Sequence, residues 1–332
     1  SAKRIRNTAL LAHSGAGKTS LADAMLFAAK AISRLGKVDD GTATSDYEPE
    51  EAKRRISLNL TVLPCTWLDH KLNLLDAPGY ADFIGDVRVS LRVSEGAVVV
   101  IDAAAGVEVG TEMAWNLVGG AGRPPRIIKK KKDRENADFF NTLEAATSKL
   151  GVKAVPVQLP IGAEAGFQGV VDLITGKAYT GGEGQEREIP ADMADLVSTY
   201  RDKLIEAAVE TDDELITKYL EGGEVTEEEL RRGLEQGARQ GQLVPVLAGS
   251  ALKSIGVNFL MDAIVRYLPS PAEVAPPKGV EVSPTTTPAA LVFKTTADPY
   301  VGKLSYFRVY SGTIASNSHV WNCTKQHDER MG

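Results

Sequence analysis

An eight-residue segment near the N-terminus has the residue types and the spacing of a phosphate-binding loop. Residues 12–19 read AHSGAGKT and fit the Walker A pattern, except that Ala12 replaces its first glycine. In that pattern backbone N–H groups cradle the phosphates, a lysine (here Lys18) reaches the β- and γ-phosphates, and a hydroxyl (here Thr19) binds Mg²⁺. We therefore expect this phosphate loop to bind a nucleotide; the alternative is a glycine-rich turn that arose by chance.

Three further motifs follow expected strands in the same way. The sequence DAPG at 76–79 offers a carboxylate (Asp76) for Mg²⁺ and a glycine N–H (Gly79) for a γ-phosphate. Asp133 would accept two hydrogen bonds from a guanine base, or would instead cap the helix that follows it. The segment Ser250–Leu252 follows a later strand, and its backbone would meet the base edge. Because α/β sheets bind ligands at the carboxyl ends of their strands, the four motifs together predict one nucleotide site.

The order of expected elements indicates an α/β fold that positions these motifs. Up to residue 160, short apolar runs alternate with helical periods, which predicts a mostly parallel sheet with helices on both faces. The two strands on either side of residues 69–70 are too close for a crossover, so they form a hairpin at one edge. Strands are expected at 5–12, 61–68, 71–75, 96–102, 126–130 and 152–158, and helices at 18–31, 81–93, 110–120 and 135–150.

The α/β rhythm breaks between residues 161 and 243, which predicts an inserted α+β subdomain. Two short strands flank a turn at Thr175-Gly176, and a charged helix over 191–221 is expected to break near Thr211. A second helix over 226–240 begins with Thr226 and Glu229 at the spacing of a capping box. A strand at 242–248 and a helix at 256–267 then resume the α/β pattern.

A Pro-rich segment after residue 268 predicts a linker to a second domain. Strands are expected at 290–296, 303–310 and 318–323, which are too few to close a barrel. We therefore expect a nucleotide domain over 1–275, with its insert, and the truncated start of a β-barrel domain over 276–332.

The composition excludes several classes of function. The net charge of −6 argues against broad nucleic-acid binding, and no apolar run approaches the length of a membrane span. The 2 cysteines provide neither a disulfide framework nor zinc-ligand spacing. We expect a soluble, cytoplasmic protein that does not engage a membrane.

These motifs, in this order, resemble those of the translational GTPases, and within that family elongation factor G and its close relatives. DAPGY at 76–80 resembles the family's DTPGH, KKKD at 130–133 its NKxD, and GSAL at 249–252 its base-contacting loop. Residues 42–58 resemble the family's first switch, and the insert matches the extra subdomain of elongation factor G. The resemblance covers about residues 5–315 and implies a P-loop GTPase domain followed by the start of a β-barrel.

The resemblance implies a GTP-hydrolysing elongation factor that uses GTP, GDP and Mg²⁺ and acts on the ribosome, in translocation of tRNA and mRNA or in recycling. It implies contacts with ribosomal RNA and a stalk protein, and a monomer off the ribosome. Catalytic roles would fall to Lys18, Gly79 and Tyr80, and metal binding to Thr19, Ser57 and Asp76. The expected nucleotide contacts are His13, Ser14, Gly15, Ala16, Gly17, Lys18, Thr19, Ser20, Asp76, Lys130, Lys131, Asp133, Ser250, Ala251 and Leu252.

Two departures from the family pattern affect the mechanism. Tyr80 stands where the family has the histidine that orients the attacking water, and a phenol is a poor base at neutral pH. A second hypothesis is therefore a non-hydrolysing or slowly hydrolysing GTP-binding paralogue with a regulatory or ribosome-protecting role. Lys130 replaces an asparagine and has no acceptor for the base pocket, which indicates divergence, a loosened pocket or an error in this stretch. An ATP-dependent P-loop enzyme is a remoter alternative.

The switch-like segment departs from the family as well. Arg55 replaces a glycine, which costs backbone freedom, and Ser57 replaces a threonine but keeps the hydroxyl that Mg²⁺ requires. Asp23 is expected on a solvated helix face and Asp46 in a mobile part of the switch.

Overall fold

The computed structural model describes every residue of the chain except 121–125, 132–134, 278, 282, 284 and 299–301. Its contacts divide the chain into two compact units, residues 1–273 and residues 274–332. The division lies within the Pro-rich segment, and the first unit holds the phosphate loop and the motifs that accompany it.

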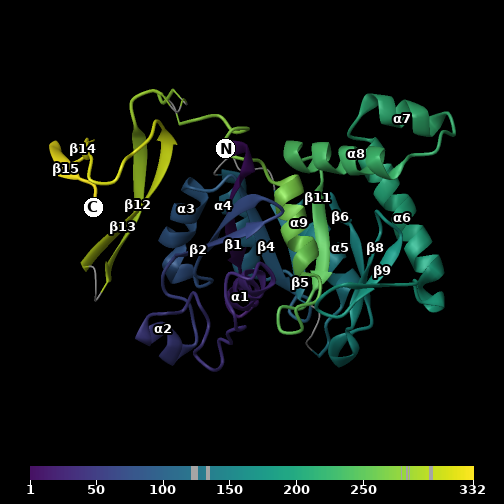
Figure 1. Cartoon of the computed structure of the whole chain (residues 1–332). Coiled ribbons are helices and arrows are strands. Elements are labelled where there is room, and N and C mark those ends of the chain that lie inside the picture. The colour runs from purple at the N-terminus through teal and green to yellow at the C-terminus, as the bar shows by residue number, and fades with distance from the viewer. Residues whose placement is uncertain (121–125, 132–134, 278, 282, 284, 299–301) are drawn as a thin grey trace. The chain divides into compact units, whose positions relative to one another are not determined.

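The first unit is built on a seven-stranded sheet in the order β2-β3-β1-β4-β5-β11-β6 (Figure 1). All neighbouring strands are parallel except the β2–β3 hairpin, which is antiparallel as expected. All seven residues of β4 are buried, which explains its continuous apolar run. The strands are β1 (Ile5–Ala12), β2 (Thr61–Trp67), β3 (His70–Asp76), β4 (Gly96–Asp102), β5 (Arg126–Lys131), β6 (Ala154–Pro156) and β11 (Val244–Gly249).

Helices connect the parallel strands, and the α/β class is therefore confirmed. They are α1 (Lys18–Ala28), α2 (Pro49–Arg54), α3 (Ile84–Arg92), α4 (Val109–Gly120), α5 (Phe139–Leu150) and α9 (Val257–Tyr267). Helices α1 and α9 pack on each other, and α4 packs on α3 and on α5. Short 3-10 helices cover Ala2–Arg4, Ala81–Phe83, Glu164–Gly166 and Ala191–Met193.

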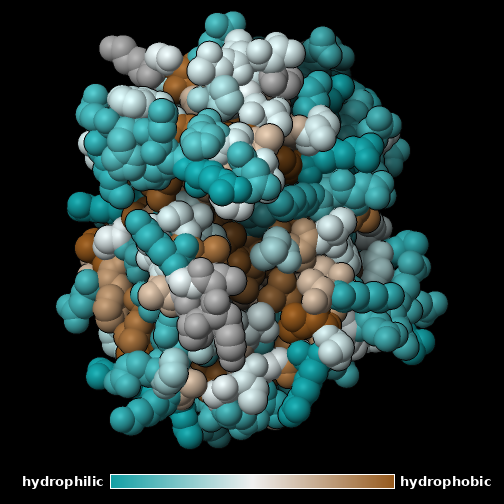
Figure 2. Space-filling model, turned by 60° about the vertical axis from the view of Figure 1, so that its left-hand side comes forward, coloured by the Kyte–Doolittle hydropathy of each residue, from teal (hydrophilic) through white to brown (hydrophobic). Residues whose placement is uncertain are grey.

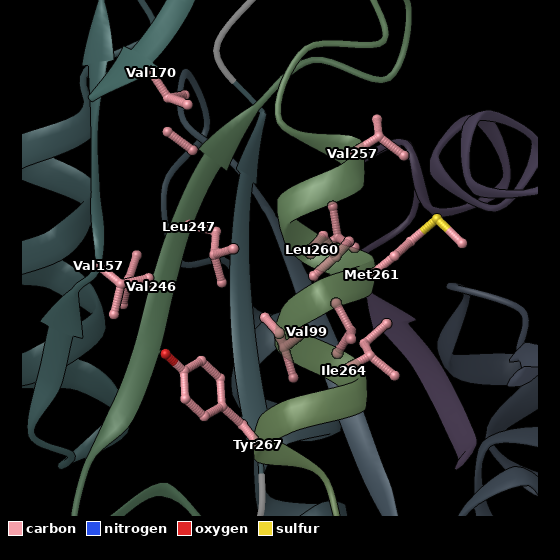
Figure 3. Packing of buried hydrophobic residues seen from close by; sticks show 14 of the residues in the cluster. Val99, Val157, Val170, Val246, Leu247, Val257, Leu260, Met261, Ile264 and Tyr267 are labelled. Atoms are coloured by element: carbon pink, nitrogen blue, oxygen red, sulfur yellow. The ribbon is translucent and has the colours of Figure 1, made fainter. Parts of the chain in front are cut away.

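The apolar face of α9 anchors the core of this unit. Its buried residues recur at helical spacing: Val257, Leu260, Met261, Ile264 and Tyr267. Figure 3 shows this stripe facing the sheet, beside labelled side chains of β4 and β11. The core thus packs against the sheet whose strand ends carry the loops of the sequence motifs.

The insert begins before residue 161, where the sequence pattern placed its start, because the strand expected at 152–158 is broken. Val157 separates β6 from β7 (Gln158–Ile161): its N–H donates to Val246 of β11, whereas its carbonyl accepts from Leu173 of the insert. One continuous apolar run therefore serves two sheets. The second sheet is antiparallel, in the order β10-β9-β8-β7, with β8 (Gly169–Asp172), β9 (Lys177–Thr180) and β10 (Gln185–Arg187).

Three helices complete the insert: α6 (Ala194–Val209), α7 (Asp213–Leu220) and α8 (Glu227–Gln240). The expected break near Thr211 is confirmed, and the Thr211 hydroxyl lies 2.7 Å from the Ala208 carbonyl and 2.8 Å from the Gly233 carbonyl. The capping box of Thr226 and Glu229 is also present at the start of α8. The insert returns the chain to the main sheet at β11.

Several element boundaries differ from the expectation for local reasons. The helix expected from residue 135 begins at Phe139, because the Asp138 side chain accepts hydrogen bonds from two backbone N–H groups there and caps it. The helix expected to reach residue 31 ends at Ala28, and Lys30 has a φ of 56°. Helix α2 was not expected, and it begins with Pro49 at the first helical position.

The second unit consists of two antiparallel strand pairs. In one pair β12 (Ala289–Asp298) runs beside β13 (Gly302–Ser311), and in the other β14 (His319–Asn322) runs beside β15 (His327–Arg330). The last strand was not expected, since HDER lacks the apolar residues of a strand pattern.

Several large apolar side chains are exposed on the surface of the chain. Figure 2 shows one face, on which hydrophobic residues form patches that hydrophilic residues interrupt. Leu68, Val109 and Leu220 are the most exposed large examples, whereas Val292 and Phe307 are exposed as partners on the paired strands β12 and β13. Among the described residues, no helix has the length and apolar character needed to cross a bilayer.

Candidate functional site

The phosphate loop joins β1 to α1, which is the placement that its pattern requires. Gly15 and Gly17 have φ values of 78° and 91°, in the left-handed region that favours glycine. Gly17 is the N-cap of α1, so the loop runs directly into the helix N-terminus, where free N–H groups favour anions. The local backbone is thus shaped as a phosphate cradle.

Gly79 lies against this loop. A Cβ atom placed on it would be 2.8 Å from Lys18 Nζ and 3.0 Å from Ser14 Cα. A side chain on Gly79 would therefore displace the Lys18 ammonium and crowd the backbone of the phosphate loop at Ser14. This contact brings the backbone after Asp76 to the place where a terminal phosphate would meet the loop.

Lys18 and Asp76 form the charged centre of the site, and both are buried. Burial lowers the pKa of the Lys18 ammonium, while the nearby Asp76 and Asp46 carboxylates raise it. Burial raises the pKa of Asp76, and the charge of Lys18 lowers it. Removing both groups from water is costly, and the charge of each group favours the ionised form of the other.

Hydroxyl and carboxylate oxygens converge next to this pair. The Thr19 hydroxyl donates to Asp76 Oδ2 at 3.0 Å and lies 3.0 Å from the Ser57 hydroxyl. The Ser45 hydroxyl also donates to Asp76 Oδ2, at 3.1 Å, and Ser57 donates to Asp46 Oδ1 at 2.8 Å. We call these five residues the oxygen cluster. It draws on α1, β3 and the segment between α1 and β2.

The oxygen cluster fits a magnesium ion. Asp46 Oδ2 and Asp76 Oδ1 are buried, and neither has a hydrogen-bond partner among the described residues. Burial raises the pKa of Asp46 to about 6, although its bond from Ser57 opposes that shift. In the described part of the chain, no group of three or more His, Cys, Asp or Glu side chains is placed to hold a metal ion. A hard cation here would therefore also need the Thr19 and Ser57 hydroxyls, which are ligand types that Mg²⁺ accepts.

Residues 42–58, the switch segment, are folded onto the site and contain α2. The fully buried Glu51 accepts N–H bonds from Leu58 at 2.8 Å and Asn59 at 3.0 Å. Arg55 ends α2 with a φ of 57° and a ψ of 38°, a conformation that is costly for a residue with a side chain. The backbone on both sides of Ser57 is therefore held in place.

Comparison with known proteins identifies the family. The model of the elongation factor Tu GTP binding domain matches residues 3–270, which is most of the chain. The chain belongs to the translational GTPase family. A solved protein from Thermus thermophilus is 37% identical, with a TM-score of 0.86, and the match covers 99% of this chain and 48% of that one. This translational GTPase chain thus spans about half the length of that similar protein.

In this translational GTPase, strand register places some of the residues that are expected to contact the base. In the main sheet β11 pairs with β5, which sets Ala248 opposite Lys130 and Gly249 opposite Lys131. The following segment is turned back by a bond from the Ser250 N–H to the Ile255 carbonyl, and Leu252 is exposed. Asp133 lies outside the described residues, so its contact with guanine stays a prediction.

Two other expected residues lie at the edge of the site. His13 Nε2 is 3.5 Å from Glu108 Oε1, and the His13 ring packs against Gly110, whose Cβ would be 2.4 Å from Nδ1. The ring therefore faces α4 while its backbone belongs to the phosphate loop. Tyr80 follows Gly79 and is 42% exposed. Its phenol is thus accessible from outside the cradle.

Sequence reasoning missed part of the site. Asp23 is wholly buried, so its expected place on a solvated helix face was wrong, and Asp46 is buried in the oxygen cluster. The spacing of four between Thr19 and Asp23 puts both on one helix face, a signal that could have indicated burial. Ser45 and Glu51 carried no comparable signal, because their partners depend on how the switch segment folds.

Proposed function

We propose that this translational GTPase binds GTP with Mg²⁺ and hydrolyses it to GDP and phosphate as an elongation factor on the ribosome. The observation that carries the proposal is the convergence of the Thr19 and Ser57 hydroxyls and the Asp76 carboxylate beside buried Lys18. By its resemblance to elongation factor G, the step served would be translocation or recycling, with ribosomal RNA and a stalk protein as partners.

In this proposal each group has a separate task. The backbone N–H groups of residues 13–20 and the Lys18 ammonium hold the phosphates. Thr19 and Ser57 would hold the metal ion, with Asp76 beside them, and the bound ion supplies neutralisation of charge on the β- and γ-phosphates. Gly79 would offer its N–H to the γ-phosphate, and the switch segment would be released when that phosphate leaves. Asp133, Lys130, Lys131 and Ser250–Leu252 would hold the base.

The role of Tyr80 decides between hydrolysis and simple binding. Its hydroxyl can hydrogen-bond a water, but it offers no cationic imidazolium to the transition state. The alternative function, a slowly hydrolysing or non-hydrolysing GTP-binding regulator or ribosome-protecting paralogue, is favoured by this substitution. Both functions require the same nucleotide site.

Phosphate release from GTP, measured with and without purified ribosomes, separates the two functions. We expect the wild-type chain to bind GTP and to release phosphate in the presence of ribosomes roughly tenfold more slowly than a Tyr80→His variant, because general acid–base groups contribute at least that much. Equal rates for the two chains would show that Tyr80 does not limit hydrolysis. GTP binding without any ribosome-dependent release would support the regulator.

A further inference from the structure

Asp23 is a buried carboxylate that the proposed mechanism does not use. It lies on α1 one turn beyond Thr19 and has no exposed surface. Its oxygens accept the Thr44 N–H at 3.0 and 3.2 Å, and the Gly36 backbone N–H donates to it as well. One side chain of α1 thus holds the backbone at two points of the loop that leads to the switch segment.

The contact at Gly36 requires a residue without a side chain. A Cβ atom there would be 2.1 Å from Asp23 Oδ2 and 2.3 Å from the Thr42 carbonyl oxygen. The φ of Gly36 lies outside the left-handed region, so the need for glycine is steric. The absence of a side chain at Gly36 therefore lets Asp23 come close enough to bind the Gly36 backbone.

Residues 37–42, between the two anchor points, form a turn that backbone hydrogen bonds close. The Thr42 N–H donates to the Lys37 carbonyl at 3.0 Å, and the Gly41 N–H donates to the Val38 carbonyl at 3.0 Å. Gly36 and Thr44 are the two ends of this turn, and Asp23 binds both ends at once.

Thr44 directly precedes the residues that enter the oxygen cluster. Ser45 donates to Asp76 through its side chain, and its carbonyl accepts from the Thr61 hydroxyl at 3.1 Å. Asp46 then binds Ser57. Fixing Thr44 to α1 therefore sets the starting position of the segment that brings Ser45, Asp46 and Ser57 to the cluster.

We propose that Asp23 is a positioning residue that latches the start of the switch segment to α1. This inference rests on the proposed binding of magnesium and GTP, because Ser57 and Asp46 act at that site. Since the latched segment meets the terminal phosphate and the metal, Asp23 favours the triphosphate complex over the GDP complex. Loss of the latch leaves the GDP cradle of residues 13–20 intact.

Two substitutions test the latch from its two sides. Asp23→Asn keeps the size of the side chain but removes one acceptor, and Gly36→Ala leaves the carboxylate and forces it away from the backbone. Asp172→Asn is the matched control: Asp172 is a half-buried carboxylate in the insert that accepts backbone N–H bonds from Ile174 at 2.8 Å and Thr175 at 3.0 Å. Melting temperatures of all three variants show that each is folded.

The first readout is the dissociation constant of the full 332-residue chain for GTPγS and for GDP in the presence of Mg²⁺. We expect Asp23→Asn and Gly36→Ala to weaken GTPγS binding about tenfold, which equals about 1.4 kcal/mol, and to leave GDP binding within about twofold. The double variant should lose no more than either single variant, because both break the same contact. Asp172→Asn should bind both nucleotides like the wild type.

The second readout needs no nucleotide. Trypsin should cut the nucleotide-free variants in the switch segment, at Lys53 to Arg55, several-fold faster than the wild type, because local opening exposes the backbone. An unchanged ratio of GTPγS to GDP affinity, or unchanged cleavage, in the two variants would overturn the latch. If the wild-type chain bound neither nucleotide, the proposed function would fail, whereas the cleavage rates would still decide whether Asp23 holds the segment.

Discussion

At the scale of single residues, the proposed nucleotide site depends on how closely the backbone can approach the phosphates. Gly15 and Gly17 supply left-handed backbone in the loop, and Gly79 supplies space beside Lys18. These needs differ in kind: two are conformational, and one is steric. The sequence motifs indicated all three glycines, because the patterns themselves contain them. The buried Asp23 was missed, since what covers a helix face is a matter of tertiary packing.

The steric need at Gly79 leads to a prediction. Gly79→Ala would place a methyl group 2.8 Å from Lys18 Nζ and 3.0 Å from Ser14 Cα, so the phosphate loop must shift. We expect at least a tenfold loss of guanine nucleotide affinity, since loop geometry of this kind positions every phosphate contact. Equilibrium titration with a fluorescent GDP measures it.

Gly85→Ala is the matched control, because a Cβ at Gly85 in α3 would meet no atom within 4 Å. It should leave nucleotide affinity unchanged and stabilise the chain by about 0.5–1 kcal/mol, since glycine weakens a helix. Wild-type affinity in the Gly79→Ala variant would contradict the close contact.

The conformation of Arg55 leads to a second prediction. Arg55→Gly would relieve a left-handed residue at the end of α2, with a φ of 57°, and we expect the segment to gain about 0.5–1 kcal/mol of local stability. Amide hydrogen exchange at Ile56 to Asn59 measures that gain. Lys53→Gly also removes a basic side chain but lies inside α2, so it should cost about 1 kcal/mol instead. Faster exchange in Arg55→Gly would refute the strain.

At the scale of elements, the sequence predicted those helices and strands whose formation depends on a local sequence pattern. The apolar run of β4 and the capping spacing of Thr226 and Glu229 are local signals, and both elements are present. The apolar segment expected as one strand at 152–158 is divided at Val157 between two sheets. This division was not predictable, because an apolar pattern does not indicate which sheet a strand joins. Helix α2 was missed because its six residues are mostly charged.

The acidic residues at the start of α8 make contacts within the insert. Glu227 pairs with Arg231, and Glu229 pairs with Lys218 while it caps the helix. Of these three glutamates, Glu228 is exposed and makes no ion pair among the described contacts. The acidic run serves mainly to begin the helix.

The pairing of Glu229 predicts a pH dependence. The bond from Lys218, followed by those from Thr226, lowers the pKa of Glu229 to about 2 from its ordinary value of 4.5. Because the folded-state pKa is lowered, the stability that Glu229 supplies is present above pH 4.5 and is lost as the pH falls toward 2. We expect Glu229→Gln to destabilise the chain in urea at about pH 7 and to approach the wild type at about pH 3.

Glu228→Gln provides the control for that experiment, because it removes a carboxylate from the same turn of α8. Its stability relative to the wild type should change little between the two pH values. A Glu229→Gln deficit that stayed constant down to the acidic end of the titration would argue against a charged contact with Lys218.

At the scale of the whole chain, elements distant in sequence carry the residues of the proposed site. The phosphate loop follows β1, Asp76 ends β3, and the segment Ser250–Leu252 follows β11 on the far side of the insert. Parallel strands bring these points to one edge of the sheet. That convergence was predictable from the order of strands and motifs, whereas the folded switch segment was not, because its contacts are long-range.

The net charge of −6 also has a clearer meaning at this scale. It argues against broad RNA binding by this chain. It does not argue against the proposed ribosomal partner, since the chain spans 48% of the similar Thermus protein and a longer protein could carry further contacts.

The most direct test of the account is competition for the nucleotide site. A fluorescent GDP is bound to the chain in Mg²⁺ and challenged with GTP or ATP, for the wild type and for Lys18→Ala. We expect GTP to displace the probe at near-equal concentration, ATP to fail at about 100-fold excess, and Lys18→Ala to lose at least about tenfold in affinity. Equal displacement by ATP, or unchanged binding by Lys18→Ala, would contradict a guanine nucleotide site at this phosphate loop.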